Sequence, residues 1–489
     1  MAARKKAFYI LPGAYSMIGI GTIFRRRAGS GGPLPPDYAK WVKEHMVFWY
    51  DISKPADVYT QNFNDWQNYN PNSVSITNNK IVVNGLIDNF RIASIGKETE
   101  SFSVFIEGLG DKNLVYRVKL DENSDRITNI KLKDGENVLP HSFVTTVAFM
   151  GVSGVTDYIG LTITQLPSGQ SVPTNEILKA NPYLQDFSGN NRPLKLNNFL
   201  FAAMSGVGGY ELNWTDQKIW TRPLGSGFNG AIEPHKLTVT SVLNSAAIIE
   251  TIVPSYAKKF KVKVSGVIDE IVAYIYKDTK GVQQRFDIRE DGEYELPSNN
   301  VVEANFNMGW RIFTASYPHT CNITIEQIPA YPNALVTDGV DDYGVMENLQ
   351  QGVKVLFVTI NPFIDGKFIY DQRLNNIKPW LFAVFNDKGS IAYNSRNSNG
   401  KTYIDGTLNE STIVSALLNK KQIITIVNND VTGDKTKTPV FFSNTDHDSG
   451  WISSAFYNSI GFDSVPTKET DGFTEQELID YVLENIITQ

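Results

Sequence analysis

The sequence predicts an all-β protein made of antiparallel sandwiches, and two observations carry this prediction. The 489-residue chain is 12% aromatic and contains 37 glycines and 22 prolines. Aromatic and β-branched residues fit a pleated, half-buried surface, and glycine and proline supply the turns between short strands. The second observation is an internal repeat, because three sequence blocks recur in the same order. At about 150 residues per domain, the chain has room for about three domains.

The repeated blocks define two related sandwiches. The matched pairs are Phe102–Leu109 with Phe260–Val267, Asp134–Glu136 with Asp291–Glu293, and Leu161–Pro167 with Asn322–Pro329. Phe260, Val262 and Val264 alternate with polar residues, which is the period of a strand with one buried face. We expect sandwiches of about six or seven strands at residues 73–167 and 237–329. The unit is too long for a solenoid repeat.

Charge and cysteine content exclude one class of partner and one kind of covalent cross-link. The net charge of -7 argues against a general nucleic-acid surface, so no nucleic-acid partner is expected. Cys321 is the single cysteine, which excludes an intrachain disulfide.

The N-terminal segment contains an uncharged run at residues 7–24 that is flanked by basic residues and is long enough to span a bilayer. Pro12, Gly13 and Gly19 interrupt its apolar character, and the basic residues on both sides remove the orientation bias of a membrane anchor. A membrane span is therefore the weaker alternative. We expect residues 1–36 to form an extended arm and a glycine-rich linker that become ordered against another protein.

After the linker, the pattern predicts a short helix and then a buried strand. Residues 37–45 place Tyr38, Trp41 and Val42 on one helical face, and Asp37 stands at the N-cap. Residues 46–50 are continuously apolar, which is typical of a fully buried strand. Near the end of the chain, Thr474 and Glu477 have the spacing of a helix capping box.

Several segments resemble parts of concanavalin-like laminin-G jelly rolls. The segments are Met46–Asp51 for the first strand, Leu184–Asn191 for a D-x-S-G-N segment, Ala334–Tyr343 for a D-G-x-D-D-Y turn, Val353–Asn361 for the next strand and Phe456–Asp463 for the last strand. In that family the first three lie close together in sequence, whereas here the two repeats separate them.

The resemblance implies a concanavalin A-like jelly roll interrupted by two related antiparallel β-sandwich insertions, with an extended N-terminal arm. The jelly roll then comprises residues 37–54, 175–235 and 330–489. Insertion into an exposed loop is tolerable because the termini of a sandwich lie at its surface. Three domains in series is the competing arrangement, and it would leave residues 48–50 and 199–210 without a partner core.

The sequence does not carry the residues of an enzyme. Glycosidases of this fold place two carboxylates about 5 Å apart on one strand, in an E-x-D-x-x-E pattern that is absent. The five histidines are scattered without a metal-ligand spacing, and no phosphate-binding glycine loop occurs. We expect a protein without catalytic activity.

Two kinds of binding residue are predicted in the jelly roll. The candidates for a glycan site are Trp380, Tyr393, Asn394, Asn397, Asp446 and Trp451. The alternative for the two tryptophans is a place in the core. Asp338, Asp341 and Asp342 cluster oxygens as calcium requires, and the alternative is that they cap their own turn. No other cofactor is expected.

The chain as a whole resembles virion proteins of tailed phages of gut bacteria, the crAss-like group among them. The resemblance rests on residues 16–27, 41–54, 186–190, 204–210 and 337–343. It implies a structural protein exposed on the virion, as a head fibre, decoration or tail-appendage subunit, assembled in the host cytoplasm. The expected partners are capsid or tail proteins, further copies of the chain and a host-surface glycan, with no membrane span. The residues expected to dock on the particle are Tyr15, Ile18, Ile20, Phe24, Arg25, Arg26 and Arg27.

A bacterial cell-surface carbohydrate-binding protein is the alternative function, followed by a degraded glycoside hydrolase. A secreted bacterial protein is expected to carry a cleavable signal or a lipobox cysteine near its start. The N-terminal segment has neither, because Arg25–Arg27 stand where the cleavage site should be.

Overall fold

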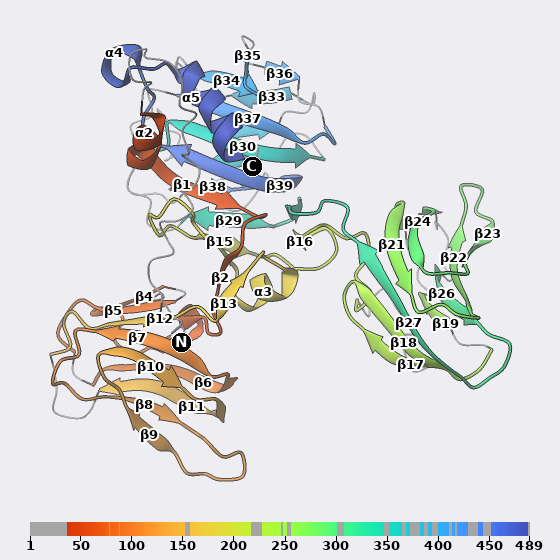
Figure 1. The fold of residues 1–489 in the computed structure, drawn as a ribbon, viewed down its shortest axis with the longest axis horizontal. Coiled ribbons are helices and arrows are strands. Elements are labelled where there is room, and N and C mark those ends of the chain that lie inside the picture. Colours follow the sequence, from red (N-terminus) through yellow and green to blue (C-terminus); the bar gives the residue numbers. More distant parts are fainter. Residues whose placement is uncertain are drawn as a thin grey trace, which may run out of the picture. The chain divides into compact units, whose positions relative to one another are not determined.

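The structure confirms the predicted all-β fold class, a jelly-roll sandwich whose sequence is interrupted by two smaller sandwiches (Figure 1). The computed structural model describes residues 37–487 except 78, 88, 152–156, 217–226, 246–247, 252–255, 301–307, 347–351, 364–367, 372–381, 386–389, 394–399, 410–412, 416–417, 429–438 and 444–450. The predicted arm therefore lies outside the described residues. Residues 53–185 form one compact unit, and the described residues on either side of that range form another.

The first sheet of the jelly roll joins strands from both ends of the chain. Its order is β16-β28-β39-β30-β37-β34-β35, and β1 also pairs with β39. The strands are β1 (Met46–Asp51), β16 (Gly206–Val207), β28 (Leu335–Asp338), β30 (Val355–Pro362), β34 (Lys401–Ile404), β35 (Thr407–Asn409), β37 (Gln422–Val427) and β39 (Ser453–Phe462). The continuously apolar strand β1 thus lies in one sheet with β28 and β39, as a split jelly roll requires.

The second sheet faces the first through aromatic side chains. From β15 onward it runs in the order β15-β29-β38-β31-β32-β33-β36. Its strands are β15 (Leu194–Asn197), β29 (Tyr343–Met346), β31 (Phe368–Asp371), β32 (Phe382–Phe385), β33 (Ser390–Tyr393), β36 (Ile413–Ser415) and β38 (Val440–Phe441). The ring of Phe441 in this sheet lies 5.8 Å from Phe48 and 6.0 Å from Tyr50 in the first sheet, both edge to face. Burial of these rings stabilises the packing of the two sheets against each other.

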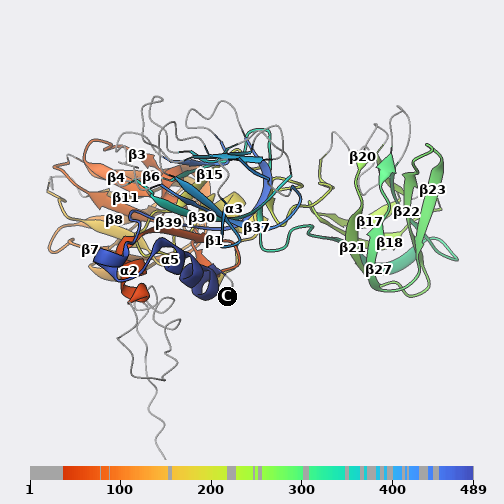
Figure 2. The ribbon, with the colours of Figure 1, turned by 90° about the horizontal axis from the view of Figure 1, so that it is seen from above.

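Short helices cover the outer face of the first sheet (Figure 2). They are α2 (Tyr38–His45), α5 (Glu475–Val482) and the π-turn η3 (Leu483–Ile487), and the short α4 (Lys468–Asp471), which buries no residue, precedes α5. The predicted caps are present, because Asp37 accepts a hydrogen bond from the Lys40 backbone and Thr474 forms a capping box with Glu477. Trp41 and Leu478 pack into one buried cluster with strands β30 and β39. Among the described helices, none has the length and apolar character needed to cross a membrane.

Residues 53–185 contain the first repeat as a sandwich of two five-stranded sheets. The orders are β10-β7-β12-β5-β4 and β3-β6-β11-β8-β9. The elements are β2 (Ala56–Val58), η2 (Phe63–Asp65), β3 (Gln67–Asn68), β4 (Val74–Thr77), β5 (Lys80–Val83), β6 (Arg91–Thr99), β7 (Phe102–Glu107), β8 (Leu114–Val118), β9 (Thr128–Lys131), β10 (Gly135–Leu139), β11 (Ser142–Gly151), β12 (Thr162–Gln165), β13 (Gly169–Ser171), α3 (Asn175–Ala180) and β14 (Tyr183–Leu184). This unit is larger than the predicted sandwich at 73–167, because residues on both sides of that range belong to it.

The second repeat has a five-stranded and a four-stranded sheet. The orders are β17-β18-β27-β21-β24 and β19-β26-β22-β23. The strands are β17 (Phe228–Ile232), β18 (Lys236–Val242), β19 (Ile248–Thr251), β20 (Tyr256–Ala257), β21 (Phe260–Ser265), β22 (Ile271–Lys277), β23 (Gln283–Ile288), β24 (Gly292–Leu296), β25 (Asn299–Asn300), β26 (Met308–Phe313) and β27 (His319–Ile328). Its core is centred on buried aromatic residues, including Trp214, Tyr274 and Trp310.

The matched sequence blocks occupy equivalent places in the two repeats. Strands β10, β7 and β12 are adjacent in the first repeat, and β24, β21 and β27 are adjacent in the second. Asp134 accepts a hydrogen bond from the Leu109 amide at 2.9 Å, and Asp291 accepts one from the Val267 amide at 2.8 Å. The repeated aspartate therefore stabilises the same turn in both sandwiches. This shared role accounts for the recurrence of the Asp-Gly-Glu block.

Candidate binding site

Most of the predicted glycan residues lie outside the described part of the chain. Trp380, Asn394, Asn397 and Asp446 are among them, and for Tyr393, at the end of β33, only the backbone is described. The predicted docking residues also lie outside the described part of the chain; they are Tyr15, Ile18, Ile20, Phe24, Arg25, Arg26 and Arg27.

Trp451 is the one predicted glycan residue whose side chain is described. It is half-buried, and its indole Nε1 is enclosed without a hydrogen-bond partner in the described structure. An enclosed N–H cannot reach a sugar hydroxyl at the surface, so the arrangement favours the core alternative for this tryptophan.

The D-x-S-G-N segment forms hydrogen bonds with the part of the jelly roll that precedes the first repeat. Asp186 is 9% exposed and accepts hydrogen bonds from the backbone N–H groups of Trp49, Ser188 and Arg192. The Nδ2 group of Asn190 donates to the Met46 carbonyl at 2.7 Å. These contacts join the segment after the first repeat to the strand before it. The motif is therefore structural in this chain.

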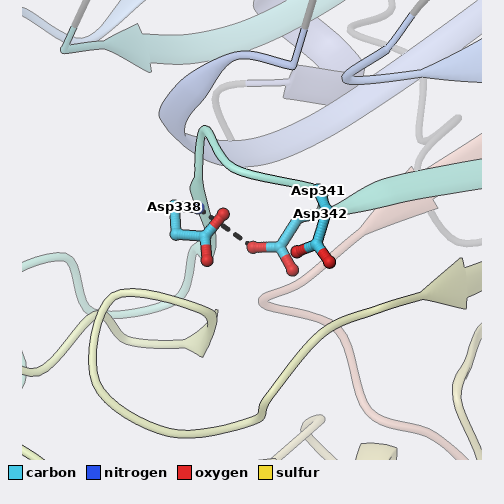
Figure 3. A group of neighbouring side chains, drawn as sticks. All are labelled: Asp338, Asp341 and Asp342. Carbon is cyan, nitrogen blue, oxygen red and sulfur yellow. Dashed lines mark hydrogen bonds between the residues drawn. The ribbon is translucent and has the colours of Figure 1, made fainter. Parts of the chain in front are cut away.

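The predicted calcium ligands do come together in space (Figure 3). One oxygen from each of Asp338, Asp341 and Asp342 lies within 4.8 Å of the others. Asp341 is the most exposed of the three, Asp338 is half-buried and Asp342 is fully buried. Carboxylate oxygens at this spacing are of the type that calcium prefers.

Hydrogen bonds within the turn already engage these carboxylates. The Val340 amide donates to Asp338 Oδ1 at 2.7 Å, and the Asp338 amide donates to Asp342 Oδ2 at 2.9 Å. Ser205 Oγ donates to Asp342 Oδ1 at 2.9 Å. This geometry favours the alternative in which the aspartates cap their own turn.

Burial raises the pKa of Asp342 to about 8, and the charge of Asp338 adds to the effect. Calcium binding would have to displace the proton that Asp342 holds near neutral pH. Calcium at this turn stays a prediction. A calorimetric titration with Ca²⁺ at pH 9, compared with Asp341→Asn, tests it.

The structure also brings together a group of aromatic residues that no sequence motif indicates. Tyr331, Phe363 and Tyr457 are half-buried around the buried Ala455 at one end of the first sheet. The rings of Tyr331 and Phe363 are 4.7 Å apart, and Lys421 Nζ lies 4.1 Å above the ring of Tyr457. The tyrosine face, as the term is used below, comprises Tyr331, Asn361, Phe363, Lys421 and Tyr457.

A local irregularity explains why the sequence pattern missed the tyrosine face. In the pairing of β30 with β39, Thr359 is opposite Asn458 and Ile360 is opposite Phe456, so Tyr457 has no counterpart. Such a bulge changes which side chains share a face of the strand. A period-two interpretation of β39 therefore cannot place Tyr457 and Asn458 correctly.

Comparisons with known proteins do not identify a family. No protein-family model matches the chain, and no curated protein matches it. Among solved structures, hazelnut (Corylus avellana) vicilin is 8% identical with a TM-score of 0.14, over 58% of this chain and 86% of that one. Oxalate decarboxylase from Bacillus subtilis is 7% identical with a TM-score of 0.12, over 63% of this chain and 87% of that one. At these TM-scores, neither likeness carries an argument about function.

Proposed function

We propose that this chain is a non-enzymatic structural protein on the outside of a phage particle, such as a head fibre, decoration or tail-appendage subunit. In this role residues 1–36 dock on capsid or tail proteins, and the sandwiches present surfaces that attach to host glycans. Further copies of the chain are expected in the same assembly.

The observation that carries the proposal is that the four resembling segments within the described residues interact in two pairs. Asp186 and Asn190 bind the backbone of the 41–54 segment. Gly206 of the 204–210 segment pairs with Val336, and Ser205 Oγ donates to Asp342 of the 337–343 segment. Scattered chance matches have no reason to pair with one another in this way. Their connection supports a shared framework with the virion proteins that the chain resembles.

Deletion of residues 1–36 tests the docking role. We expect the truncated protein to fold and to be missing from purified particles, as measured by mass spectrometry of the particle proteins and by circular dichroism of the soluble protein. Replacement of Arg25, Arg26 and Arg27 by alanine is the finer variant. Normal incorporation of the truncated protein would contradict the proposal.

A bacterial cell-surface carbohydrate-binding protein is the alternative. Fractionation of the producing cells distinguishes the two roles, because the alternative requires the protein on the cell envelope in cells that make no particles.

A further inference from the structure

Two loops lie side by side at one end of the jelly roll, where the chain passes between its two sheets. Residues 198–205 lead from β15 to β16, and residues 339–342 lead from β28 to β29. Strands β15 and β29 pair in one sheet, and β16 and β28 pair in the other. The Asn198 Nδ2 group donates to the Asp341 carbonyl at 3.2 Å. The two loops, called the corner loops below, therefore form one surface.

Each corner loop presents one aliphatic side chain to solvent. Leu200 is 68% exposed and Val340 is 64% exposed, and they are called the aliphatic pair below. Leu200 stands between Phe199 and Phe201, which are buried and whose ring centroids lie 5.8 Å apart. The Leu200 amide donates to Ser205 Oγ at 2.9 Å. The leucine is therefore held outward by a well-packed loop.

The backbone of residues 198–205 adopts a conformation that its side chains disfavour. Asn198, Phe201 and Ala203 have positive φ angles of 65°, 51° and 49°. This region is strained for residues with a Cβ atom, and such residues cluster where a protein holds a binding surface in a fixed shape. Together with the exposed aliphatic pair, this strain indicates a surface that meets a partner.

The charges of the chain indicate which partner fits the corner loops. Val340 lies in the turn between Asp338 and Asp341, which Figure 3 shows, so carboxylates border the aliphatic pair. Residues 1–36 contain six basic side chains and no acidic one, which leaves 39 basic against 52 acidic side chains in the rest of the chain. Within this arm, the segment 15–27 is mainly apolar and ends in three consecutive arginines. An apolar segment with a basic end matches an aliphatic pair with an acidic border.

The arm joins the jelly roll at the end opposite to the corner loops. Strand β1 begins with Met46 opposite Phe462, and the ring of Trp41 in α2 lies 5.6 Å from that of Phe462. Asp338, at the start of a corner loop, is instead opposite Ser453. Ser453 and Phe462 are the two ends of β39, and nine residue steps along a strand span about 30 Å.

This separation favours the corner loops of a second copy over those of the same chain. Ten residue steps separate Arg27 from Asp37, and even a fully extended chain of that length reaches about 35 Å at most. A glycine-rich linker of ten residues has a root-mean-square length of about 18 Å. Binding within one chain would therefore require the linker to be almost fully stretched, whereas binding between copies does not.

We propose that the corner loops of one copy bind the arm segment 15–27 of a second copy, so that the copies join head to tail. Apolar side chains of the arm then cover the aliphatic pair, and the arginines meet the aspartates of the turn. Such a contact uses different surfaces on the two copies, and it closes into a ring or extends into a filament. The proposal rests on the further copies expected under the proposed function, and it leaves residues 1–14 to contact the capsid or tail protein.

The first test identifies which copy the arm contacts. A photo-crosslinking benzoylphenylalanine replaces Phe24 in the full-length protein, and the irradiated protein is separated on a denaturing gel. We expect covalent dimers and larger species, in which mass spectrometry places the cross-link on residues 198–205 or 339–342 of the other copy. A cross-link within a single copy, or one to another part of a second copy, would overturn the proposal.

The second test measures self-association of the full-length protein by analytical ultracentrifugation. We expect the double variant Leu200→Ser with Val340→Ser, which removes the aliphatic pair, to raise the dissociation constant at least about tenfold. The matched control is Leu86→Ser with Val138→Ser in the first repeat, where the two side chains are 68% and 72% exposed. The control should associate as the parent does. All four side chains are exposed, and near-ultraviolet circular dichroism checks that both variants fold.

The proposal and the virion role fail in different ways. A parent protein that stays monomeric at every concentration, or unchanged association of the folded double variant, would overturn the contact between copies. Particle incorporation is measured separately by mass spectrometry of purified particles. Copies that associate in solution and are missing from particles would contradict the virion role alone, whereas a monomeric protein that enters particles would contradict this contact alone.

Discussion

At the scale of single residues, Asp186 holds the two ends of the interrupted jelly roll together. Its carboxylate accepts hydrogen bonds from three backbone amides and from Ser188 Oγ. Removing the acceptor leaves buried donors without partners, which is more costly than the bonds themselves are worth. The residue is therefore more important for stability than its place in a loop between strands indicates.

We expect Asp186→Ala to destabilise the jelly roll by about 2–4 kcal/mol. Hydrogen exchange of the β1 segment is the measurement, because the Trp49 amide donates directly to Asp186. Asp121→Ala is the matched control, since Asp121 is an exposed acceptor for the Asn123 amide and its loss should cost less than about 0.5 kcal/mol. Equal protection of β1 in both variants would refute this role for Asp186.

Asp342 makes the stability of the jelly roll depend on pH. Its folded pKa of about 8 lies above the ordinary aspartate value of 3.8, so the folded state binds the additional proton between these values. Stability is then fully present below about pH 4, falls as the pH rises towards 8, and becomes constant above that. The slope is at most about 1.4 kcal/mol per pH unit.

Asp342→Asn should remove this slope and raise the melting temperature at pH 9 relative to the parent protein. Asparagine can still accept from the Asp338 amide and donate to Ser205 Oγ, so the turn keeps its hydrogen bonds. Asp125→Asn, at an exposed position of the first repeat, is the control and should leave the profile unchanged. A melting profile that has the same pH slope in the Asp342 variant and the parent would contradict the assignment.

At the scale of elements, the repeats reuse one tight turn after the strands β7 and β21. Gly108 and Gly266 both have positive φ angles, of 77° and 84°. A Cβ atom at Gly266 would lie 2.0 Å from the carbonyl oxygen of Asn322, and one at Gly108 would lie 2.5 Å from that of Gly160. The turn brings two backbone segments so close together that only glycine fits between them.

Gly266→Ala should destabilise the second repeat by more than about 3 kcal/mol, through the backbone clash added to the strain of positive φ. Gly281→Ala isolates the strain alone, because Gly281 has a φ of 74° and nothing lies within 4 Å of its Cβ position. That variant should lose about 1–2 kcal/mol. The comparison is made by thermal unfolding of the two proteins, and equal losses would show that the close approach does not matter.

The sequence predicted the elements whose pattern is local. The apolar run of β1, the alternation of β21, the cap of α2 and the capping box of α5 all follow from neighbouring residues. The repeat also predicted which strands correspond. What the sequence pattern missed depends on contacts between distant segments, above all the bulge at Tyr457, which arises from the register between β30 and β39.

The candidate site was harder to predict from the sequence, because it also depends on contacts between distant segments. The Asp338–Asp342 group was found because its members are adjacent in sequence. Asn361, Tyr331 and Tyr457 are separated along the chain and come together only through β30, β28 and β39. No sequence window contains them.

At the scale of the whole molecule, the two sandwiches interrupt a fold whose ends remain adjacent. The Phe187 amide donates to the Trp49 carbonyl at 2.8 Å across the first interruption. Across the second, the Ala330 amide donates to the Gly209 carbonyl at 2.9 Å. A chain that leaves and returns at neighbouring points can lose the inserted part without losing its core.

We expect the jelly roll to fold after residues 53–185 are replaced by a short glycine-serine linker. The measurement is near-ultraviolet circular dichroism together with hydrogen exchange of β1 and β39. Residues 53–185, produced alone, serve as the control and should fold as an independent unit. Loss of protection in β1 and β39 in the shortened chain would contradict the insertion.

We propose that the chain belongs to the surface of a phage particle, on which residues 1–36 anchor it. A cryo-electron microscopy map of particles from the phage that encodes the chain tests it most directly. We expect density for the jelly roll outside the particle, with residues 1–36 ordered against a capsid or tail protein. A map in which the chain is absent, or in which residues 1–36 contact no other virion protein, would rule out this role.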